Sequence, residues 1–119
     1  MNAARAQHGL RPLRVDGALV VAARRHTTDM LRRNYFSHGN FSARIRTFHA
    51  RGPVFGENLA WGTGSYATAQ SIVAQWLASP PHRANLLRAG FSRVGIGAGV
   101  GTFAGAGGAT VVTAEFAGR

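Results

Sequence analysis

The stretch Val54-Phe-Gly-Glu-Asn-Leu-Ala-Trp61 organises the chain, because it places a carboxylate, Glu57, and an amide, Asn58, inside an apolar run. Only four of the 119 residues are acidic. A polar group that is buried without a partner costs free energy, so Glu57 needs a dedicated partner. The sequence predicts an extended segment that ends at Gly62-Thr-Gly64, with the partner of Glu57 supplied from elsewhere in the fold.

Length and composition are those of one globular domain. Apolar residues make up 45% of the chain and charged residues 15%, which is a folded rather than a disordered composition. No apolar run approaches the roughly 20 residues of a membrane-spanning helix, so we expect a soluble protein with one domain over residues 1–119. The absence of cysteine excludes disulfides and thiolate chemistry. The residues after Met1 are polar and do not resemble a signal peptide.

The chain is strongly basic, with 14 arginines, no lysine and a formal net charge of +10. Nucleic acid, an anionic polymer and an acidic membrane surface are all possible partners for such a charge. The arginines occur singly or in pairs, such as Arg24-Arg25 and Arg32-Arg33, and aromatic residues are not interleaved with them. This pattern argues against specific nucleic-acid binding and favours a solvated basic surface.

The first third of the chain has helical periodicity. Residues 2–8 predict a short helix, and Asp16 is expected to cap a longer one that runs to about Arg33. Asp29 lies four residues from both Arg25 and Arg33, which predicts a solvated row of ion pairs. His26 lies on the apolar side of this helix. A hydrogen-bonded core histidine is more common there than a ligand, so we leave it out of the candidate site.

A loop histidine, His38, follows this helix in the run Tyr35-Phe-Ser-His-Gly39. Loops on a rigid scaffold often carry functional residues, which makes His38 a better candidate than a histidine on a helix stripe. Residues 42–51 then predict a short basic helix with Ile45 and Phe48 as its apolar pair. His49 on this segment is expected to be exposed.

The second half contains two further helical segments. Ser65 is expected to cap a helix with a strong apolar face. That face consists of Ala69, Ile72, Val73, Trp76 and Leu77. The run Ser79-Pro-Pro81 breaks the helix and starts a new turn, which places His82 at a helix N-terminus. Free N–H groups and the helix dipole disfavour the imidazolium there, and a neutral imidazole can act as a metal ligand or a base.

The C-terminal part predicts two strands. Val94–Val100 alternates between apolar residues and glycines, which is typical of a strand whose glycine face lets another element approach closely. The glycine-rich residues 99–109 predict a flexible hairpin loop, since no phosphate-loop motif is present. Residues 110–116 are expected to return as a second, antiparallel strand.

Three motifs stand in an order and at spacings that are together highly specific. They are Tyr-Phe-Ser-His38, Gly-Glu57-Asn-Leu-Ala and Trp76-Leu-Ala-Ser-Pro-Pro-His82-Arg-Ala-Asn-Leu-Leu. With the opening Asn2-Ala-Ala-Arg-Ala-Gln-His-Gly-Leu and the closing Thr-Ala-Glu-Phe, the chain resembles the bacterial branch of the CAP family, also called SCP-like, over nearly its whole length. The resemblance implies an α+β fold, a three-layer α-β-α sandwich with a small, mainly antiparallel sheet between helices.

The resemblance also implies a cleft lined by two histidines and acidic groups, in which a divalent metal, often zinc, can bind. By motif position His38 matches the first cleft histidine, Glu57 the acid and His82 the second histidine. Many relatives carry a second acid where this chain has Ser79, so the set here is a triad. Asn58 and Ser79 are further candidate ligand-binding residues.

Two chemistries remain open for the triad. Two imidazoles and one carboxylate, with water as a fourth ligand, make an open zinc site. Without metal, the same residues form a charge-assisted hydrogen-bond cluster in which Glu57 fixes a histidine tautomer.

Three functional hypotheses follow. The first is a secreted or surface-associated binding module for a lipid or sterol, an acidic envelope polymer or a protein. The second is a hydrolase of an extracellular peptide, ester or wall substrate, in which His38, Glu57 and His82 hold a metal or act as acid and base. No Gly-x-Ser-x-Gly nucleophile motif supports it. The third is a purely structural cluster. Extracellular or cell-envelope localisation is implied by the resemblance and not by the residues.

Overall fold

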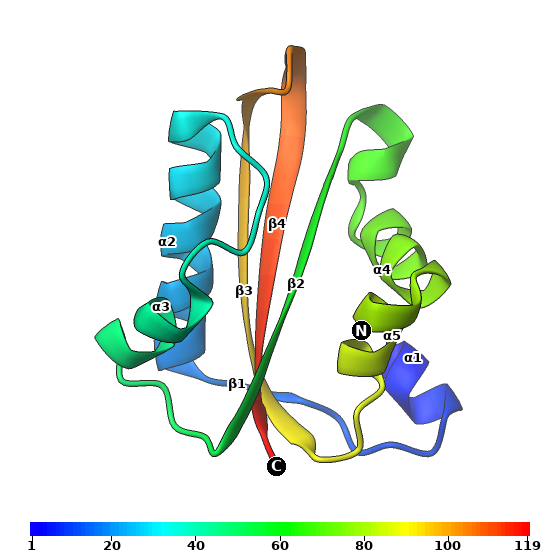
Figure 1. The fold of residues 1–119 in the computed structure, drawn as a ribbon. Helices are drawn as coiled ribbons and strands as arrows, with labels where there is room; N and C mark the ends of the chain where they lie inside the picture. The colour runs from blue at the N-terminus through cyan, green and yellow to red at the C-terminus, as the bar shows by residue number, and fades with distance from the viewer.

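The computed structural model describes all residues, 1–119, as three layers (Figure 1). One face of the central sheet is covered by α2 (Gly17–Arg33) and α3 (Phe41–Thr47). The other face is covered by α1 (Asn2–Gln7), α4 (Ala69–Ala78) and α5 (Pro80–Leu86). The predicted α+β fold, an α-β-α sandwich, is therefore confirmed. None of the five helices combines the length and hydropathy needed to cross a membrane.

The sheet has four strands in the order β1-β3-β4-β2. Their bounds are β1 (Arg14–Val15), β2 (Val54–Gly62), β3 (Phe91–Phe103) and β4 (Ala106–Gly118). β2 and β3 both pair antiparallel with β4, and only the short β1 pairs parallel, with β3. The sheet is mainly antiparallel, as expected. The stretch that contains Glu57 is β2, which forms one edge of the sheet.

The glycine face of β3 is where α2 packs. A Cβ atom at Gly95 would overlap the backbone of Leu19, and one at Gly97 would lie 2.5 Å from the backbone of Ala23. Any side chain at these positions would collide with the helix backbone. The expected close approach to this face is therefore confirmed, and the approaching element is α2.

The β3–β4 hairpin is longer than the sequence predicts. Pairing continues to Phe103 opposite Ala106, so the expectation of a flexible loop over residues 99–109 is wrong. Only Ala104 and Gly105 form the turn, both with positive φ, 50° and 80°. Two such residues give a turn whose twist matches that of the flanking strands, so the ladder can extend to the tip.

The helix starts are fixed by side-chain caps. The Asp16 side chain accepts the N–H of Leu19 at 3.1 Å, as predicted for α2. The cap of α4 is Thr68 and not Ser65, because residues Gly64–Ala67 form a separate 3₁₀ turn, η1, before α4 begins.

Helix α3 is shorter than predicted. It ends at Thr47 after an N-terminal cap by Asn40. Ile45 is buried against the α2 side of the fold and Phe48 is half-buried, while His49 is exposed as expected. The shorter helix places the chain for its return into β2.

Apolar side chains pack on both faces of the sheet. The larger core lies between the sheet and the layer of α1, α4 and α5, where Trp76 and Leu86 meet Phe91 and Phe116. Trp76 also donates its indole N–H to the carbonyl of Leu59 at 3.0 Å, which fastens α4 to the edge strand β2. The layer that contains α4 is therefore fixed against β2.

Candidate functional site

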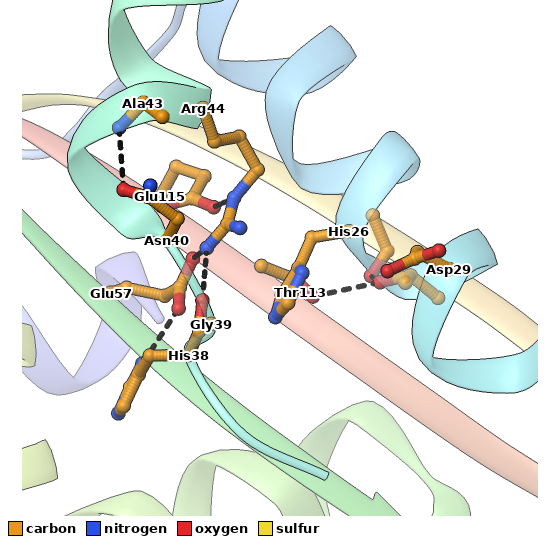
Figure 2. A network of polar contacts seen from close by, with 12 residues as sticks. His26, Asp29, His38, Gly39, Asn40, Ala43, Arg44, Glu57, Thr113 and Glu115 are labelled. Carbon is orange, nitrogen blue, oxygen red and sulfur yellow. Dashed lines mark hydrogen bonds and ion pairs between the residues drawn. The ribbon is translucent and has the colours of Figure 1, made fainter. Parts of the chain in front are cut away.

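Glu57 lies in the middle of β2, is only 6% exposed, and has both carboxylate oxygens engaged (Figure 2). His38 donates from Nδ1 to Oε1 at 2.6 Å, and Arg44 donates from Nη2 to Oε2 at 2.5 Å. The prediction that Glu57 has a dedicated partner is thus confirmed, and one partner is His38 from the loop after α2. The second partner, Arg44, was not predicted.

Arg44 is the hub of this cluster. Its guanidinium donates to Glu57, to the backbone carbonyl of His38 at 2.9 Å and, through Nε, to Glu115 Oε1 at 3.3 Å. The side chain is only 11% exposed. One sequence signal could have found it. Arg44 stands beside Ile45 and four residues before Phe48, on the apolar side of its helix, where an arginine requires an acidic partner.

Glu115 is a second buried carboxyl group in the cluster. It lies directly opposite Glu57 in the β2–β4 register and has no exposed surface. Burial, together with the hydrogen bond and the negative charge of Glu57, raises the pKa of Glu115 to about 10. The sequence predicts Glu57 as the single carboxylate of the cleft. The structure adds a second carboxyl group, Glu115, next to it.

The two carboxyl groups carry one proton between them at neutral pH. Burial by itself raises the pKa of Glu57, but the hydrogen bond from Glu115, the charge of Arg44 and the hydrogen bond from His38 together lower it. Oε2 of Glu115 has no donor among the protein groups. A proton on this oxygen, donated to Glu57, gives it a partner. Glu57 is then the ionised member and Glu115 the neutral one.

His82 lies in the first turn of α5, as predicted. α5 and α3, the helix of Arg44, cover opposite faces of the sheet (Figure 1). Its Nδ1 is 2.9 Å from Oγ of Ser79. Burial, and secondarily the charge of His38, lowers the pKa of His82, so its imidazole is neutral at pH 7. No hydrogen bond or ion pair joins His82 to Glu57. Of the two histidines that could partner Glu57, only His38 does so, because Arg44 holds the second carboxylate oxygen, Oε2.

Asn58 is fully buried, and its side chain bonds to two residues of α5. Its Nδ2 donates to the backbone carbonyl of His82 at 2.9 Å, and its Oδ1 accepts from Asn85 at 3.0 Å. Asn85 also donates to the carbonyl of Glu57 at 3.2 Å. These bonds use the Asn58 amide inside the protein and fix α5 against β2. We therefore assign Asn58 a supporting role that positions His82.

A hollow of about 310 Å³ lies above β2, between the two helical layers. Phe36, from the loop after α2, stands on one side, and Ser79 and His82 stand on the other. Its remaining lining residues are Leu59, Ala60, Trp61, Gln75 and Trp76. His38 does not line this hollow, but it is near enough for its charge to lower the pKa of His82. We call the hollow together with His38 the cleft, which then contains both predicted histidines and Ser79.

The architecture matches a known family. The model of the cysteine-rich secretory protein family, CAP, matches residues 1–116. The chain belongs to the CAP family. The sequence resemblance is thereby confirmed.

Relatives of this CAP domain include bacterial proteins. YkwD of Bacillus subtilis is 35% identical over 101 residues, which are 81% of this chain and 38% of that protein. An extracellular protein with an SCP domain from Bacillus anthracis superposes with a TM-score of 0.82 at 28% identity, over 99% of this chain and 37% of that one. The chain thus spans less than half of these proteins.

A more distant likeness concerns the fold alone. An outer surface protein of Borrelia burgdorferi gives a TM-score of 0.75 at 20% identity, over 99% of this chain and 86% of that one. The same arrangement of layers therefore recurs in a protein of nearly the same size.

The metal-binding potential of the CAP cleft depends on two imidazoles. No group of three or more His, Cys, Asp or Glu side chains is placed to hold an ion. Glu57 does not fit as a ligand, because His38 and the cationic Arg44 occupy its oxygens. Nε2 of both His38 and His82 makes no hydrogen bond. A Zn²⁺ ion would use these two atoms, with Glu57 fixing the His38 tautomer. Metal binding by His38 and His82 stays a prediction, with Glu57 as a residue that orients His38.

Two residues near the CAP cleft have structural roles. His26 is buried, and its Nε2 donates to the carbonyl of Ser37 at 2.8 Å, which confirms it as a core histidine that steadies the loop before His38. Asp29 accepts from Arg33 at 3.2 Å and from the Tyr35 hydroxyl at 2.5 Å. The expected second ion pair, with Arg25, is absent.

Proposed function

We propose that this CAP domain is an extracellular binding module whose cleft binds an amphiphilic ligand. The observation that carries the proposal is that polar and aromatic side chains line the same hollow. Ser79 and His82 are among its polar groups and Phe36 and Trp61 among its aromatic ones. We call the first pair, together with His38, the polar end of the cleft and the second pair its apolar end. The extracellular location is supported by the Bacillus anthracis neighbour, which is an extracellular protein.

The polar end offers two imidazole groups that the protein leaves partly free. The His38 side chain is 55% exposed, and its Nδ1 is anchored on Glu57. This anchoring leaves Nε2 of His38 as the atom that meets a ligand. Nε2 of the neutral His82 is a second such atom. Together they suit a ligand head group that bears a hydroxyl or an acidic oxygen, as in a sterol or a lipid.

The apolar end is a preformed aromatic surface. The rings of Phe36 and Trp61 both pack edge-on against Phe103, with centroid distances of 6.2 Å and 5.4 Å. Phe36 is nevertheless 45% exposed. Because Phe103 is buried and holds both rings, a ligand meets them without a large cost in side-chain entropy. An exposed aromatic ring at the rim of a hollow is typical of a ligand site.

The proposal is tested by calorimetric titration with lauric acid and with a lysophospholipid, each below its critical micelle concentration. Phe36→Ala and His82→Ala should each lower the affinity at least tenfold. His49→Ala, which removes an exposed histidine outside the cleft, should leave it unchanged. Binding that survives both cleft substitutions, or no binding of either compound, would overturn the assignment.

A second candidate is a hydrolase that acts on an extracellular ester, peptide or wall polymer. The observation in its favour is the 2.9 Å contact between Ser79 Oγ and the neutral His82, which could serve as a base. A bound divalent cation would supply Lewis-acid chemistry at the same histidines. Turnover of fluorogenic esters and peptides that is abolished by Ser79→Ala or His82→Ala supports this candidate. Equal turnover in wild type and variants excludes it.

A further inference from the structure

A second concentration of charge lies on the outer surface of α2, the helix that Figure 1 shows packed beside β3. α2 packs over β3, whereas the cleft lies over the opposite edge strand, β2. Four exposed arginines stand on this surface, and we call them the arginine face: Arg24, Arg25, Arg32 and Arg33. The only acidic residue among them is Asp29.

Most of the arginine face is unpaired within the protein. Asp29 pairs with Arg33, and its Oδ2 accepts from both Arg33 and the Tyr35 hydroxyl. The side chains of Arg24, Arg25 and Arg32 form no hydrogen bond and no ion pair with any other residue. Three cations on about two turns of one helix, none of them ion-paired and with Asp29 as the single nearby acid, create a local positive potential that attracts an anionic partner.

Two adjoining hollows shape this surface. The first, of about 350 Å³, is lined by Val21, Arg24, Arg25, Thr28 and Arg32. The second, also of about 350 Å³, is lined by Arg25 and Arg33 from α2, together with other polar side chains. Those side chains belong to His26, Asp29, Tyr35, Asn40 and Arg44, and Gly39 completes the lining. Arg25 lines both hollows, so the two lie side by side on the surface of α2.

We propose that the arginine face binds an anionic polymer of polyol phosphodiester units, with phosphates seated in the two hollows. Guanidinium groups bind phosphate oxygens through paired N–H donors, and the Thr28 hydroxyl adds a further donor to the first hollow. Along the helix, Arg25 and Arg32 are about 10 Å apart at 1.5 Å per residue. This spacing requires a ligand with at least two anionic groups and a flexible connection. The surface does not depend on the function proposed for the cleft.

A lipid bilayer fits this surface less well than a soluble polymer. A helix that lies in a membrane interface presents an apolar side to the lipid, but the apolar side of α2 is buried against the sheet. Val21, at 45% exposure, is the only large apolar side chain exposed on the helix. The arginines are also arranged around hollows and not on a flat plane.

Nucleic acid fits less well for a different reason. Single-stranded nucleic acids are usually held by bases that stack on exposed aromatic rings as well as by phosphate contacts. The only ring beside the arginine face is Tyr35, and the guanidinium of Arg33 already covers it at 5.2 Å from the ring centroid. The surface therefore offers phosphate contacts without a stacking platform.

The experiment measures binding of a fluorescein-labelled synthetic poly(glycerol phosphate) of twelve units by fluorescence polarisation at 150 mM salt. The test variant combines Arg24→Gln, Arg25→Gln and Arg32→Gln. We expect its affinity to fall at least tenfold. The slope of log K against log salt concentration should become shallower by roughly 2, because three ion contacts are lost.

A matched control removes the same charge elsewhere. Arg11, Arg14 and Arg119 are exposed, and their side chains make no hydrogen bond or ion pair, so their triple change to glutamine lowers the net charge equally. This control should weaken binding less than threefold, and both variants should keep the wild-type melting temperature within a few degrees. An equal loss of affinity in the two variants would overturn the proposal, because only the total charge would then matter. Tighter binding of phosphatidylglycerol vesicles, or of a twelve-nucleotide single-stranded DNA, would also overturn it.

Discussion

Glu57 on β2 and Glu115 on β4 face each other across the sheet and carry one proton between them. Arg44 bridges the two carboxyl groups from α3 and also holds the loop that bears His38. The polar end of the cleft therefore rests on a buried, hydrogen-bonded platform. His38 receives its orientation from this platform, whereas His82 is placed independently by Asn58.

The raised pKa of Glu115 predicts a specific dependence of stability on pH. The folded protein keeps this carboxyl protonated up to about pH 10, whereas the unfolded chain releases the proton near pH 4.5. Between these values the folded state binds more protons, so stability falls as pH rises. In Glu115→Gln this loss is absent. Urea unfolding should show the variant gaining on the wild type between pH 5 and 8, by at most about 1.4 kcal/mol per pH unit. Parallel stability curves for the two proteins would contradict the shared proton.

Loss of Glu57 should destabilise the fold. Glu57→Ala leaves Arg44 without its closest anionic partner and Glu115 without its acceptor, both in a buried setting. Removing one member of a buried charged pair typically costs about 3–5 kcal/mol, so the melting temperature should fall by roughly ten degrees or more. Calorimetry is the measurement, with Glu57→Gln as the milder comparison. An unchanged melting temperature would show that the carboxylate is not a buried, paired group.

The packing of α2 on β3 predicts an unusual sensitivity to one methyl group. Gly95→Ala drives a Cβ atom into the α2 backbone, which cannot move without displacing the helix. Overpacking of this kind costs about 3 kcal/mol or more. Gly107→Ala is the matched control, because no atom lies within 4 Å of its added Cβ. Thermal unfolding should separate the two variants clearly, and similar melting temperatures would disprove the close approach.

Zinc binding should depend on the histidines more than on Glu57. Calorimetric titration with zinc should lose its signal in His38→Ala and in His82→Ala. Glu57→Gln should retain binding with an affinity about 10–100-fold lower, as expected for a residue that orients a ligand. Equal weak heats in the wild type and all variants would rule out the metal site.

Local periodicity predicts most of the helices and strands and their order, whereas the layers and the cleft residues His38, Glu57 and His82 are predicted by the resemblance of the motifs to the CAP family. His38 and His82 could be placed in this way, since each has a distinctive local setting beside glycine or proline. The length of the β3–β4 hairpin could not be predicted from the sequence. Glycine is as compatible with a loop as with a strand that a helix approaches closely.

Arg44 and Glu115 escaped prediction for a physical reason. Arg44 is one of 14 arginines, and only the packing of α3 distinguishes it from a solvated one. Glu115 stays protonated because the β2–β4 register places it, buried, opposite the negative charge of Glu57. Pairing between distant strands follows from the whole fold, so local sequence patterns do not contain it.

The central claim is that His38 and His82 form one end of a ligand-binding cleft. The most direct measurement is a carbon–proton NMR correlation spectrum of the histidine rings during titration with lauric acid. We predict that the signals of His38 and His82 shift and saturate together, while those of the exposed His8 and His49 stay in place. Shifts of equal size at all of these histidines, or shifts confined to His49, would contradict the account.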